Sequence, residues 1–257
     1  MRPLEGQHAV VTGGGRGIGA SVAAALAQQG ATLTLMGRDA HRLEAQAEHL
    51  GVITRVRPIV VDVTDAASVE AAFGGAVDAA GPINILINNA GAVATASFGK
   101  TDAGLWNEML AVNLTGTYLC CQQVISSMLQ RGYGRVVNVA STAGLTGYAY
   151  VTAYCAAKHG VVGLTRALAM ETARKNITVN AVCPGYTETD IVRDAVVNIV
   201  AKTGKTEDEA RAALISRNPQ QRLVRPEEVA NAVLWLCLPG SEAITGQTIA
   251  VAGGELL

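Results

Sequence analysis

Two kinds of segment follow one another along the chain, and they differ in the spacing of their apolar residues. Short apolar runs predict β-strands near residues 8–12, 32–36, 56–61, 83–87, 135–140, 177–183 and 247–251. Stretches with helical spacing predict α-helices near residues 18–29, 40–50, 66–80, 103–130, 153–174 and 226–238. Because the strands lack strict alternation, they are typical of a sheet covered on both faces. The pattern therefore predicts an α/β fold with a doubly wound parallel sheet of about seven strands.

Residues 190–222 lie outside this regular order and predict two short helices that break at Thr203-Gly204. Thr206, with acidic residues in the next turn, is typical of a helix N-cap, and Pro219 indicates where the helical part ends. No linker, repeat or low-complexity segment divides the 257 residues. We therefore expect residues 1–257 to form a single domain.

The composition of the chain limits the classes of partner that we expect it to bind. Hydrophobic residues make up 49% of the chain and charged residues only 16%, which favours further surface buried between subunits and hence a homo-oligomer. The net charge of -1, from 20 basic and 21 acidic residues, gives no electrostatic footprint for nucleic acid. The apolar stretches are too short to span a membrane. We therefore expect a small-molecule substrate, with neither nucleic acid nor membrane as a partner.

The cysteines and histidines indicate the cellular compartment of the protein and whether it binds a metal. The five cysteines form no paired framework and no signal-peptide pattern precedes Arg2 and Pro3, so we expect a cytoplasmic protein. The four histidines, at positions 8, 41, 49 and 159, are too scattered for a metal site. We therefore expect no bound metal.

The most informative motif is Y-C-A-A-K, in which Tyr154 and Lys158 are four residues apart. On a helix this spacing puts both side chains on one face, so the Lys158 ammonium is expected to lower the phenol pKa of Tyr154 from about 10. A phenol tuned in this way can exchange a proton with an alcohol or carbonyl oxygen. Ser141, thirteen residues before the tyrosine, is expected to hydrogen-bond the same oxygen. The three residues predict an acid–base site.

Near the N-terminus an apolar run is followed by T-G-G-G-R-G-I-G and an alanine-rich helical pattern. This order of strand, glycine-rich turn and helix is the context that a dinucleotide-binding loop requires. Gly13 permits a tight turn, Gly17 lets the backbone approach a pyrophosphate, and Gly19 allows the helix to pack closely on the strand. The start of the helix offers free N–H groups and the positive end of its dipole to the phosphates.

Together these motifs resemble the short-chain dehydrogenase/reductase family. The matching pieces occur in family order and spacing across essentially the whole chain: T-G-G-G-R-G-I-G at 12–19, D-V at 62–63, N-N-A-G at 88–91, Asn113, Ser141, Tyr154 with Lys158, and P-G-Y-T-E-T at 184–189. The resemblance implies a Rossmann-type fold, an NAD(P)-dependent oxidoreductase and a homotetramer. It also implies that residues 190–222 form a lid over the substrate.

By this resemblance the cofactor-binding residues are Gly13, Gly15, Arg16, Gly17, Ile18, Gly19, Arg38, Asp62, Val63, Asn89, Ala90, Gly91, Tyr154, Lys158, Pro184, Gly185, Thr187 and Thr189. The catalytic roles are implied in the same way. Tyr154 is expected to donate the proton in reduction, Lys158 to lower its pKa and anchor the nicotinamide ribose, and Ser141 to position the carbonyl. Asn113 is expected to complete a proton relay through a water molecule. The cofactor carries the hydride, and the protein supplies alignment and charge.

The end of the second predicted strand bears on the choice of cofactor, because a carboxylate there binds a ribose 2′-OH and a cation accommodates a 2′-phosphate. Gly37 stands where NAD-preferring members have aspartate, and Arg38 follows it. Arg16, in the glycine loop, adds a second cation. NADP(H) is therefore favoured, while Asp39, as a ribose ligand one position late, leaves NAD(H) open.

Within the family, the chain resembles polyketide ketoreductases and 3-hydroxybutyrate dehydrogenases. Ala143 and Val151 stand where the latter have the His and Lys that bind a free carboxylate. The substrate wall is expected to be apolar and aromatic, formed by Val93, Leu145, Tyr148 and Tyr150. The resemblance therefore favours reduction of a 3-ketoacyl thioester or a similar hydrophobic ketone.

Two other functions stay open. One is an NAD(H)-dependent secondary-alcohol dehydrogenase acting on a hydroxyacyl, steroid or cyclic alcohol, which differs in cofactor preference. The other is a non-catalytic cofactor-binding protein. The complete set of Asn113, Ser141, Tyr154 and Lys158 argues against the latter, because a binding module needs no tuned phenol.

Overall fold

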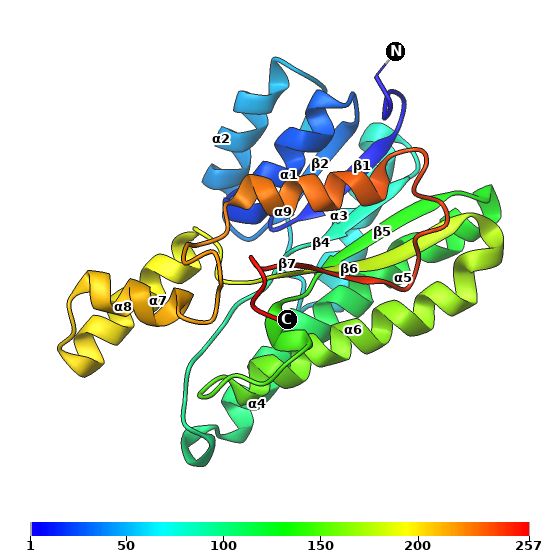
Figure 1. Ribbon diagram of the computed structural model, residues 1–257. Coiled ribbons are helices and arrows are strands. Elements are labelled where there is room, and N and C mark those ends of the chain that lie inside the picture. Colours follow the sequence, from blue (N-terminus) through cyan, green and yellow to red (C-terminus); the bar gives the residue numbers. More distant parts are fainter. Residues whose placement is uncertain (1, 257) are drawn as a thin grey trace.

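A seven-stranded sheet forms the centre of the computed structural model, which describes residues 2–256 (Figure 1). All strand pairs are parallel, and their order is β3-β2-β1-β4-β5-β6-β7. The strands are β1 His8–Thr12, β2 Thr32–Gly37, β3 Val56–Val60, β4 Ile85–Asn88, β5 Gly134–Val139, β6 Ile177–Pro184 and β7 Thr248–Val251. The predicted doubly wound α/β fold is confirmed, with small shifts at the strand ends.

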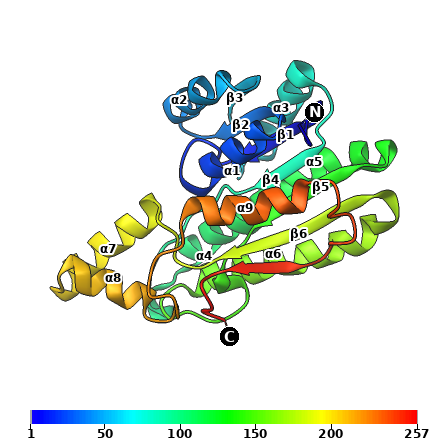
Figure 2. The same cartoon turned by 45° about the horizontal axis from the view of Figure 1, so that its top comes forward.

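The helices form one layer on each face of the sheet (Figures 1 and 2). Val10 and Val11 point to opposite faces of β1, because side chains alternate along a strand, and they belong to two separate core clusters. The cluster around Val11 includes α1, α2 and α9, and the cluster around Val10 includes α3, α5 and the end of α6. These helices are α1 Gly17–Gln28, α2 Ala40–Gly51, α3 Ala66–Ala80, α5 Gly116–Arg131, α6 Thr152–Thr172 and α9 Pro226–Cys237.

β1 lies between β2 and β4, so the order of strand addition reverses there. Strands β2 and β3 lie on one side of β1, and strands β4 to β7 lie on its other side. At such a reversal the loops that leave the two central strands diverge, and a crevice opens at their carboxyl ends. The glycine loop follows β1 and the segment N-N-A-G spans the end of β4, so both border this crevice.

The helix predicted over 103–130 is present, but one π turn interrupts its regular α-helical hydrogen bonding. It comprises α4 (Ala103–Leu110), a π turn at Ala111–Thr115, and α5. The reason is the Asn113 side chain, whose Nδ2 donates to the Met109 carbonyl oxygen at 3.0 Å and to the Ala92 carbonyl oxygen at 2.9 Å. In a regular α-helix the Met109 carbonyl oxygen would accept from the backbone N–H of residue 113. Here the Asn113 side-chain amide donates to it instead, and the helix widens at this turn.

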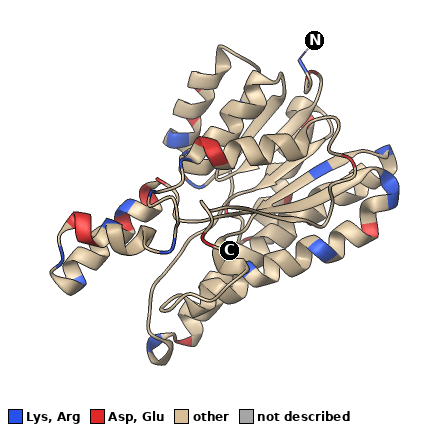
Figure 3. Cartoon of the chain, viewed as in Figure 1, with Lys and Arg blue, Asp and Glu red and all other residues tan. Residues whose placement is uncertain are grey.

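The two short helices expected within residues 190–222 are α7 (Asp190–Thr203) and α8 (Glu207–Ile215), which project beside the sheet in both views (Figures 1 and 2). Gly204 ends α7 in the left-handed conformation with φ 70°, and Thr206 forms a capping box with Glu209. Acidic and basic residues alternate along α7, whereas in α8 three acidic residues precede Arg211 (Figure 3). Within residues 2–256, no helix has the length and apolar character needed to cross a membrane.

Candidate active site

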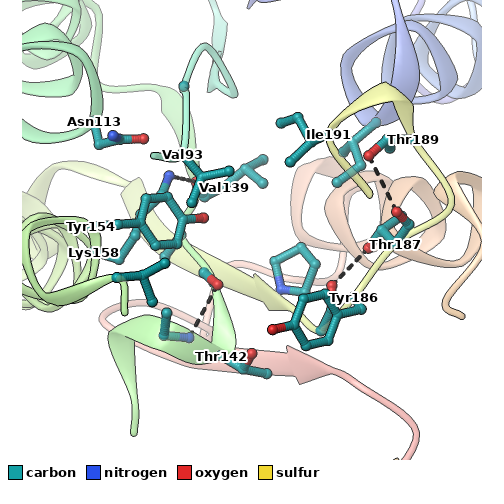
Figure 4. A pocket seen from close by; sticks show the side chains of 18 of the residues that line it. Val93, Asn113, Val139, Thr142, Tyr154, Lys158, Tyr186, Thr187, Thr189 and Ile191 are labelled. Atoms are coloured by element: carbon teal, nitrogen blue, oxygen red, sulfur yellow. Dashed lines mark hydrogen bonds between the residues drawn. The ribbon is translucent and has the colours of Figure 1, made fainter. Parts of the chain in front are cut away.

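A continuous crevice in two parts runs along the carboxyl ends of the strands. The glycine loop and the residues that follow β2 and β3 line the first part, and residues after β5 together with α6 line the second. The residues that line both parts, and so join them, are Ile18, Asn89, Gly91, Thr189 and Ile191. Figure 4 shows the second part, with the side chains of Tyr154, Lys158 and Asn113 on one side and those of Tyr186, Thr187 and Thr189 on the other.

The structure places the predicted cofactor residues along this crevice. Its first part includes Gly13, Gly15, Arg16, Gly17, Ile18, Arg38, Asp62, Val63, Asn89, Ala90 and Gly91. Its second part includes Tyr154, Lys158, Pro184, Gly185, Thr187 and Thr189. Gly19 is the exception, because it lies beneath the loop, where an added Cβ would collide with the Gly13 carbonyl group.

The glycine loop has the backbone of an anion cradle. Gly13 and Gly17 have φ of 64° and 52°, a region that side chains disfavour, and a Cβ on Gly13 would lie 2.8 Å from Asn89 Nδ2. α1 begins at Gly17, and the N-cap residue Arg16 forms no capping hydrogen bond with its side chain. The first N–H groups of α1 are therefore directed at the crevice, and the loop fits the diphosphate of a dinucleotide.

Hydrogen bonds at Asn89 and at Asp62 fix two further segments that line the first part of the crevice. Asn89 Nδ2 donates to the carbonyl oxygens of Thr12 and Gly13, at 3.1 and 3.2 Å, which ties the end of β4 to the glycine loop. The Asp62 carboxylate accepts from the backbone N and the hydroxyl of Thr64, and these hydrogen bonds lower its pKa. Asp62 is therefore held ionised at the edge of the crevice, where it can accept a hydrogen bond from a bound base.

The outer end of the first part is rich in charge. Arg16, Arg38 and Arg42 all line it, together with Asp39 and Asp190. Asp39 caps α2: its Oδ1 accepts from Arg42 N at 3.1 Å, and its Oδ2 pairs with Arg42 Nε at 3.1 Å. Both carboxylate oxygens of Asp39 are thus already engaged. Arg16, Arg38 and Arg42 lie together at this end of the crevice, and Arg16 and Arg42 are themselves paired with Asp190.

In the second part, Ser141 follows β5 while Tyr154 and Lys158 share one face of α6. Ser141 Oγ accepts from Ala143 N at 3.1 Å, which fixes the serine at the start of a short 3-10 turn. The Lys158 ammonium is buried and donates to the Val139 carbonyl oxygen at 2.9 Å. The structure therefore brings Ser141, Tyr154 and Lys158, three of the four predicted catalytic side chains, to the lining of one cavity.

The expected direction of the Tyr154 pKa shift was wrong. Burial raises the pKa of Tyr154 to about 12, and the opposing hydrogen bond from Ser141 is the smaller effect. Lys158 does not offset the burial, because its ammonium is directed at Val139 and lies 5.7 Å from the centroid of the Tyr154 ring. Burial also lowers the pKa of Lys158 to about 8. Around neutral pH the phenol is therefore protonated, and the amine is close to its own titration.

Asn113 is fully buried, and its amide group is satisfied by backbone. Besides its two donor contacts, its Oδ1 accepts from Ala92 N at 3.3 Å. A Cβ added to Gly91 would lie 2.8 Å from Asn113 Oδ1 and 3.7 Å from Lys158 Nζ. Because Gly91 has no side chain, the space beside these two polar groups stays open to the crevice.

The segment after β6 closes the second part from the other side. Thr187 Oγ1 donates to the Gly185 carbonyl oxygen at 3.0 Å, and Thr189 Oγ1 donates to the Thr187 carbonyl oxygen at 3.2 Å (Figure 4). These bonds fold the segment into a tight turn over the cavity. Thr189 also packs on the glycine loop, since its Cγ2 lies 3.2 Å from the position of a Cβ on Gly17.

The expected substrate wall is only half right. Val93 and Tyr148 line the cavity, and so do Ala143 and Val151. Leu145 instead packs against the core beside α6, and Tyr150 is 66% exposed and outside the cavity lining. Both lie in an irregular loop, where spacing alone does not fix the direction of a side chain.

Sequence reasoning missed several residues of the site. Tyr186 lines the cavity and meets Tyr148 edge to face, with ring centroids 6.3 Å apart. The Tyr148 hydroxyl lies 2.8 Å from Thr142 Oγ1 and 2.5 Å from Glu255 Oε1. Arg42 and Asp190 complete the charged end of the crevice. The only available signal was their nearness to motifs, since Arg42 follows G-R-D and Asp190 follows T-E-T.

Comparisons with known proteins find a matching family model, similar sequences and similar solved structures. A family model described as short chain dehydrogenase matches residues 7–199. The 3-oxoacyl-acyl-carrier-protein reductase FabG of Vibrio harveyi is 38% identical over 98% of this chain and 98% of its own length. The 2-(S)-hydroxypropyl-CoM dehydrogenase 3 of Xanthobacter autotrophicus is 35% identical over 98% of this chain and 97% of its own. A crystal structure of an actinorhodin polyketide ketoreductase variant with NADPH has a TM-score of 0.93 at 36% identity, covering 97% of each chain.

Proposed function

The chain belongs to the short-chain dehydrogenase family of oxidoreductases, and from that premise we propose that it is an NADP(H)-dependent reductase of a 3-ketoacyl thioester or a similar hydrophobic ketone. One observation carries the proposal: a crevice that begins at a phosphate cradle with three arginines ends at Ser141, Tyr154 and Lys158. The first end suits a phosphorylated dinucleotide. The second end suits proton transfer to a carbonyl oxygen.

The charged end of the crevice supports NADP(H) over NAD(H). A ribose 2′-OH calls for a free carboxylate at the end of β2, but that strand ends at Gly37. Asp39, the nearest alternative, is occupied as the N-cap of α2 and by Arg42. Arg16, Arg38 and Arg42 instead offer guanidinium groups, which match the geometry of a phosphate. The polyketide ketoreductase structure with NADPH is a precedent among similar proteins.

Each catalytic residue has a proposed task. Ser141 holds the substrate carbonyl oxygen by a hydrogen bond, and Tyr154 donates a proton to that oxygen. The raised pKa of Tyr154 suits this direction, because the donor has to be protonated before the reaction. Lys158 holds its positive charge in the same cavity, where its ammonium is proposed to anchor the nicotinamide ribose. When bound, the nicotinamide supplies the hydride.

Asn113 and Gly91 have supporting tasks in this proposal. Asn113 fastens the backbone after β4 to the helix that carries it, and its Oδ1 faces the same small region as Lys158 Nζ. Once Tyr154 has given up its proton, Lys158 would pass a proton toward the phenolate, and a water molecule between Asn113 and Lys158 would restore the proton of the lysine. Gly91 leaves the room that such a relay needs.

The lining of the cavity supports a hydrophobic ketone. Ala143 and Val151 offer no partner to a free carboxylate, while Val93, Tyr148 and Tyr186 form apolar and aromatic surface. Similar proteins act, by their names, on oxoacyl groups carried by acyl carrier protein and on a hydroxypropyl group carried by CoM. The second name keeps an NAD(H)-dependent secondary-alcohol dehydrogenase as the alternative. Its substrate would carry a hydroxyl where the ketone lies.

We place the enzyme in the cytoplasm as a homotetramer of single-domain subunits, with residues 190–222 as the substrate lid. All five cysteines are free, and burial raises the thiol pKa of Cys120, Cys121, Cys183 and Cys237, so they stay reduced and unreactive. Subunit contacts are expected on α5 and α6, where Tyr118 is 43% and Met170 is 84% exposed.

The proposal is tested by following NADPH oxidation with 3-ketoacyl thioesters, cyclic ketones and quinones, each repeated with NADH. Turnover of a 3-ketoacyl thioester that is at least about tenfold more efficient with NADPH is the expected result. Faster turnover with NADH, or oxidation of a secondary alcohol with no detectable ketone reduction, would favour the alternative.

A further inference from the structure

The Asp190 carboxylate, at the first residue of α7, meets arginines from three parts of the chain. Its Oδ2 pairs with Arg16 Nη1 and with Arg42 Nη1, both at 3.0 Å, and its Oδ1 pairs with Arg193. Arg16 belongs to the glycine loop and Arg42 to the first turn of α2, whereas Arg193 is one turn further along α7. The Arg42 and Arg16 guanidinium groups hold the pKa of Asp190 below its usual range, so the carboxylate is ionised.

This contact lies in the part of the crevice where a dinucleotide would place its adenosine ribose. Arg16, Arg42 and Asp190 line it together with Gly37 and Arg38, which are at and after the end of β2. A carboxylate oxygen that accepts from two guanidinium groups occupies the position that a phosphate oxygen would take between the same two groups. Asp190, in the proposed lid, therefore places its carboxylate on Arg16 and Arg42, the same cations that a 2′-phosphate needs.

The start of α7 is held against the glycine loop by more than charge. Thr189 precedes Asp190, and its methyl carbon would touch a Cβ placed on Gly17 at 3.2 Å. The backbone at this point is thus close enough to keep the Asp190 side chain over Arg16. The Asp190 side chain is 30% exposed, and Arg16 and Arg42 are 55% and 47% exposed, so each pair is weak enough to be exchanged.

We propose that Asp190 is a specificity-determining residue of the cofactor site, whose carboxylate competes with the 2′-phosphate of NADP(H) for Arg16 and Arg42. The inference rests on the proposed NADP(H) preference. Binding of the phosphate displaces Asp190 and frees the first turn of α7 from the glycine loop. A dinucleotide without the 2′-phosphate leaves the two ion pairs in place.

The test is a calorimetric titration of the full-length wild type and of Asp190→Asn with NADPH, NADH, adenosine 2′,5′-bisphosphate and AMP. Because exposed pairs are weak, Asp190→Asn should lower the Kd of NADPH and of the bisphosphate about three- to tenfold. The Kd of NADH and of AMP should change less than twofold. Asp194→Asn, on the same helix, is the matched control and should leave all four Kd values unchanged. Thermal melting of the ligand-free variants checks that the fold is retained.

A second variant measures the competition directly. Arg42→Gln should weaken NADPH about fivefold or more and NADH little, and in the Arg42→Gln background the gain from Asp190→Asn should shrink. Arg57→Gln, on the exposed side of β3, is the control for loss of one positive charge. Equal effects of Asp190→Asn on NADPH and NADH, or no effect on either, overturn the inference. Tighter binding of NADH than NADPH by the wild type overturns the proposed cofactor preference instead, so the two failures are told apart.

Discussion

The ammonium nitrogen of Lys158 lies 5.7 Å from the centroid of the Tyr154 ring, and its hydrogen bond goes to the Val139 carbonyl oxygen. The lysine is therefore positioned by the end of β5 and not by the phenol. The four-residue spacing predicts that Lys158 both supplies a charge near the phenol and sets the phenol pKa, but the structure assigns these two effects to different groups. Lys158 supplies a charge near the phenol, while burial and Ser141 set the phenol pKa.

Replacing Tyr154 by phenylalanine removes the proposed proton donor and little else. We expect kcat for ketone reduction to fall by about 10²- to 10⁴-fold, which is the usual contribution of a positioned acid. The Kd of NADPH, measured by titration of its fluorescence, should change by less than about threefold. Tyr150→Phe serves as the control, because the Tyr150 ring is exposed and outside the cavity. Retained turnover in Tyr154→Phe would remove the tyrosine from the mechanism.

The pH dependence of reduction should report Lys158. Burial lowers the pKa of Lys158 to about 8, and burial raises that of Tyr154 to about 12. Below pH 8 both groups carry their protons. As the pH rises through about 8, the lysine loses its charge, so kcat/KM for reduction should fall by the titration of one group.

His159→Gln is the control for this profile, since His159 directly follows Lys158 in α6 but does not line the cavity. The variant should keep the same fall in kcat/KM. A profile that stays flat between about pH 7 and 9, or a fall that disappears in His159→Gln, would exclude Lys158 as its source.

The buried charge of Lys158 should also lower stability. Its pKa is about 8 in the folded protein and 10.5 when unperturbed, so the unfolded chain binds more protons between these values. The penalty is full below pH 8 and disappears as the pH rises through 8 to 10.5. Lys158→Met should therefore raise the free energy of unfolding at pH 7 by about 1 to 3 kcal/mol while abolishing turnover.

Urea unfolding at about pH 7 and about pH 10 measures this difference, which should be smaller at the higher pH. Lys175→Met, at an exposed position, should differ from the wild type at neither pH. A Lys158→Met protein that is less stable than the wild type at pH 7 would mean that the hydrogen bond to Val139 outweighs the cost of burying the charge.

The sequence was sufficient for most of the fold, because strands and helices leave local periodic signals and motifs leave fixed spacings. Ser141, Tyr154 and Lys158 were found in this way, and the structure brings them to one cavity. The π turn at Asn113 was not found, because it depends on contact between that amide and Ala92, in the loop after β4. A helical pattern carries no record of such a contact.

Tertiary burial explains the remaining differences. The pKa of Tyr154 depends on how much water the folded chain removes from the phenol, which a four-residue spacing does not contain. The ion pairs of Asp190 with Arg16 and Arg42 join residues 174 and 148 positions apart, so no local pattern predicts them. The roles of residues within a motif could therefore be predicted from the sequence, whereas pKa values and ion pairs that depend on packing could not.

Gly91 should tolerate no side chain. Alanine there would place a Cβ 2.8 Å from Asn113 Oδ1, and the Asn113 amide cannot move away because Ala92 and Met109 hold it by hydrogen bonds. Either Asn113 or the backbone after β4 has to shift, and both border Lys158. We expect kcat/KM to fall by about ten- to hundredfold and the free energy of unfolding to fall by about 1 kcal/mol.

Gly74→Ala is the matched control, because Gly74 lies in α3 and a Cβ there has nothing within 4 Å. It should raise the free energy of unfolding by about 0.5 to 1 kcal/mol, since alanine favours a helix over glycine, and leave kcat/KM unchanged. Both variants are compared by urea unfolding and by steady-state kinetics with NADPH. If Gly91→Ala matched the wild type in both measurements, the close spacing of Gly91, Asn113 and Lys158 would have no part in catalysis.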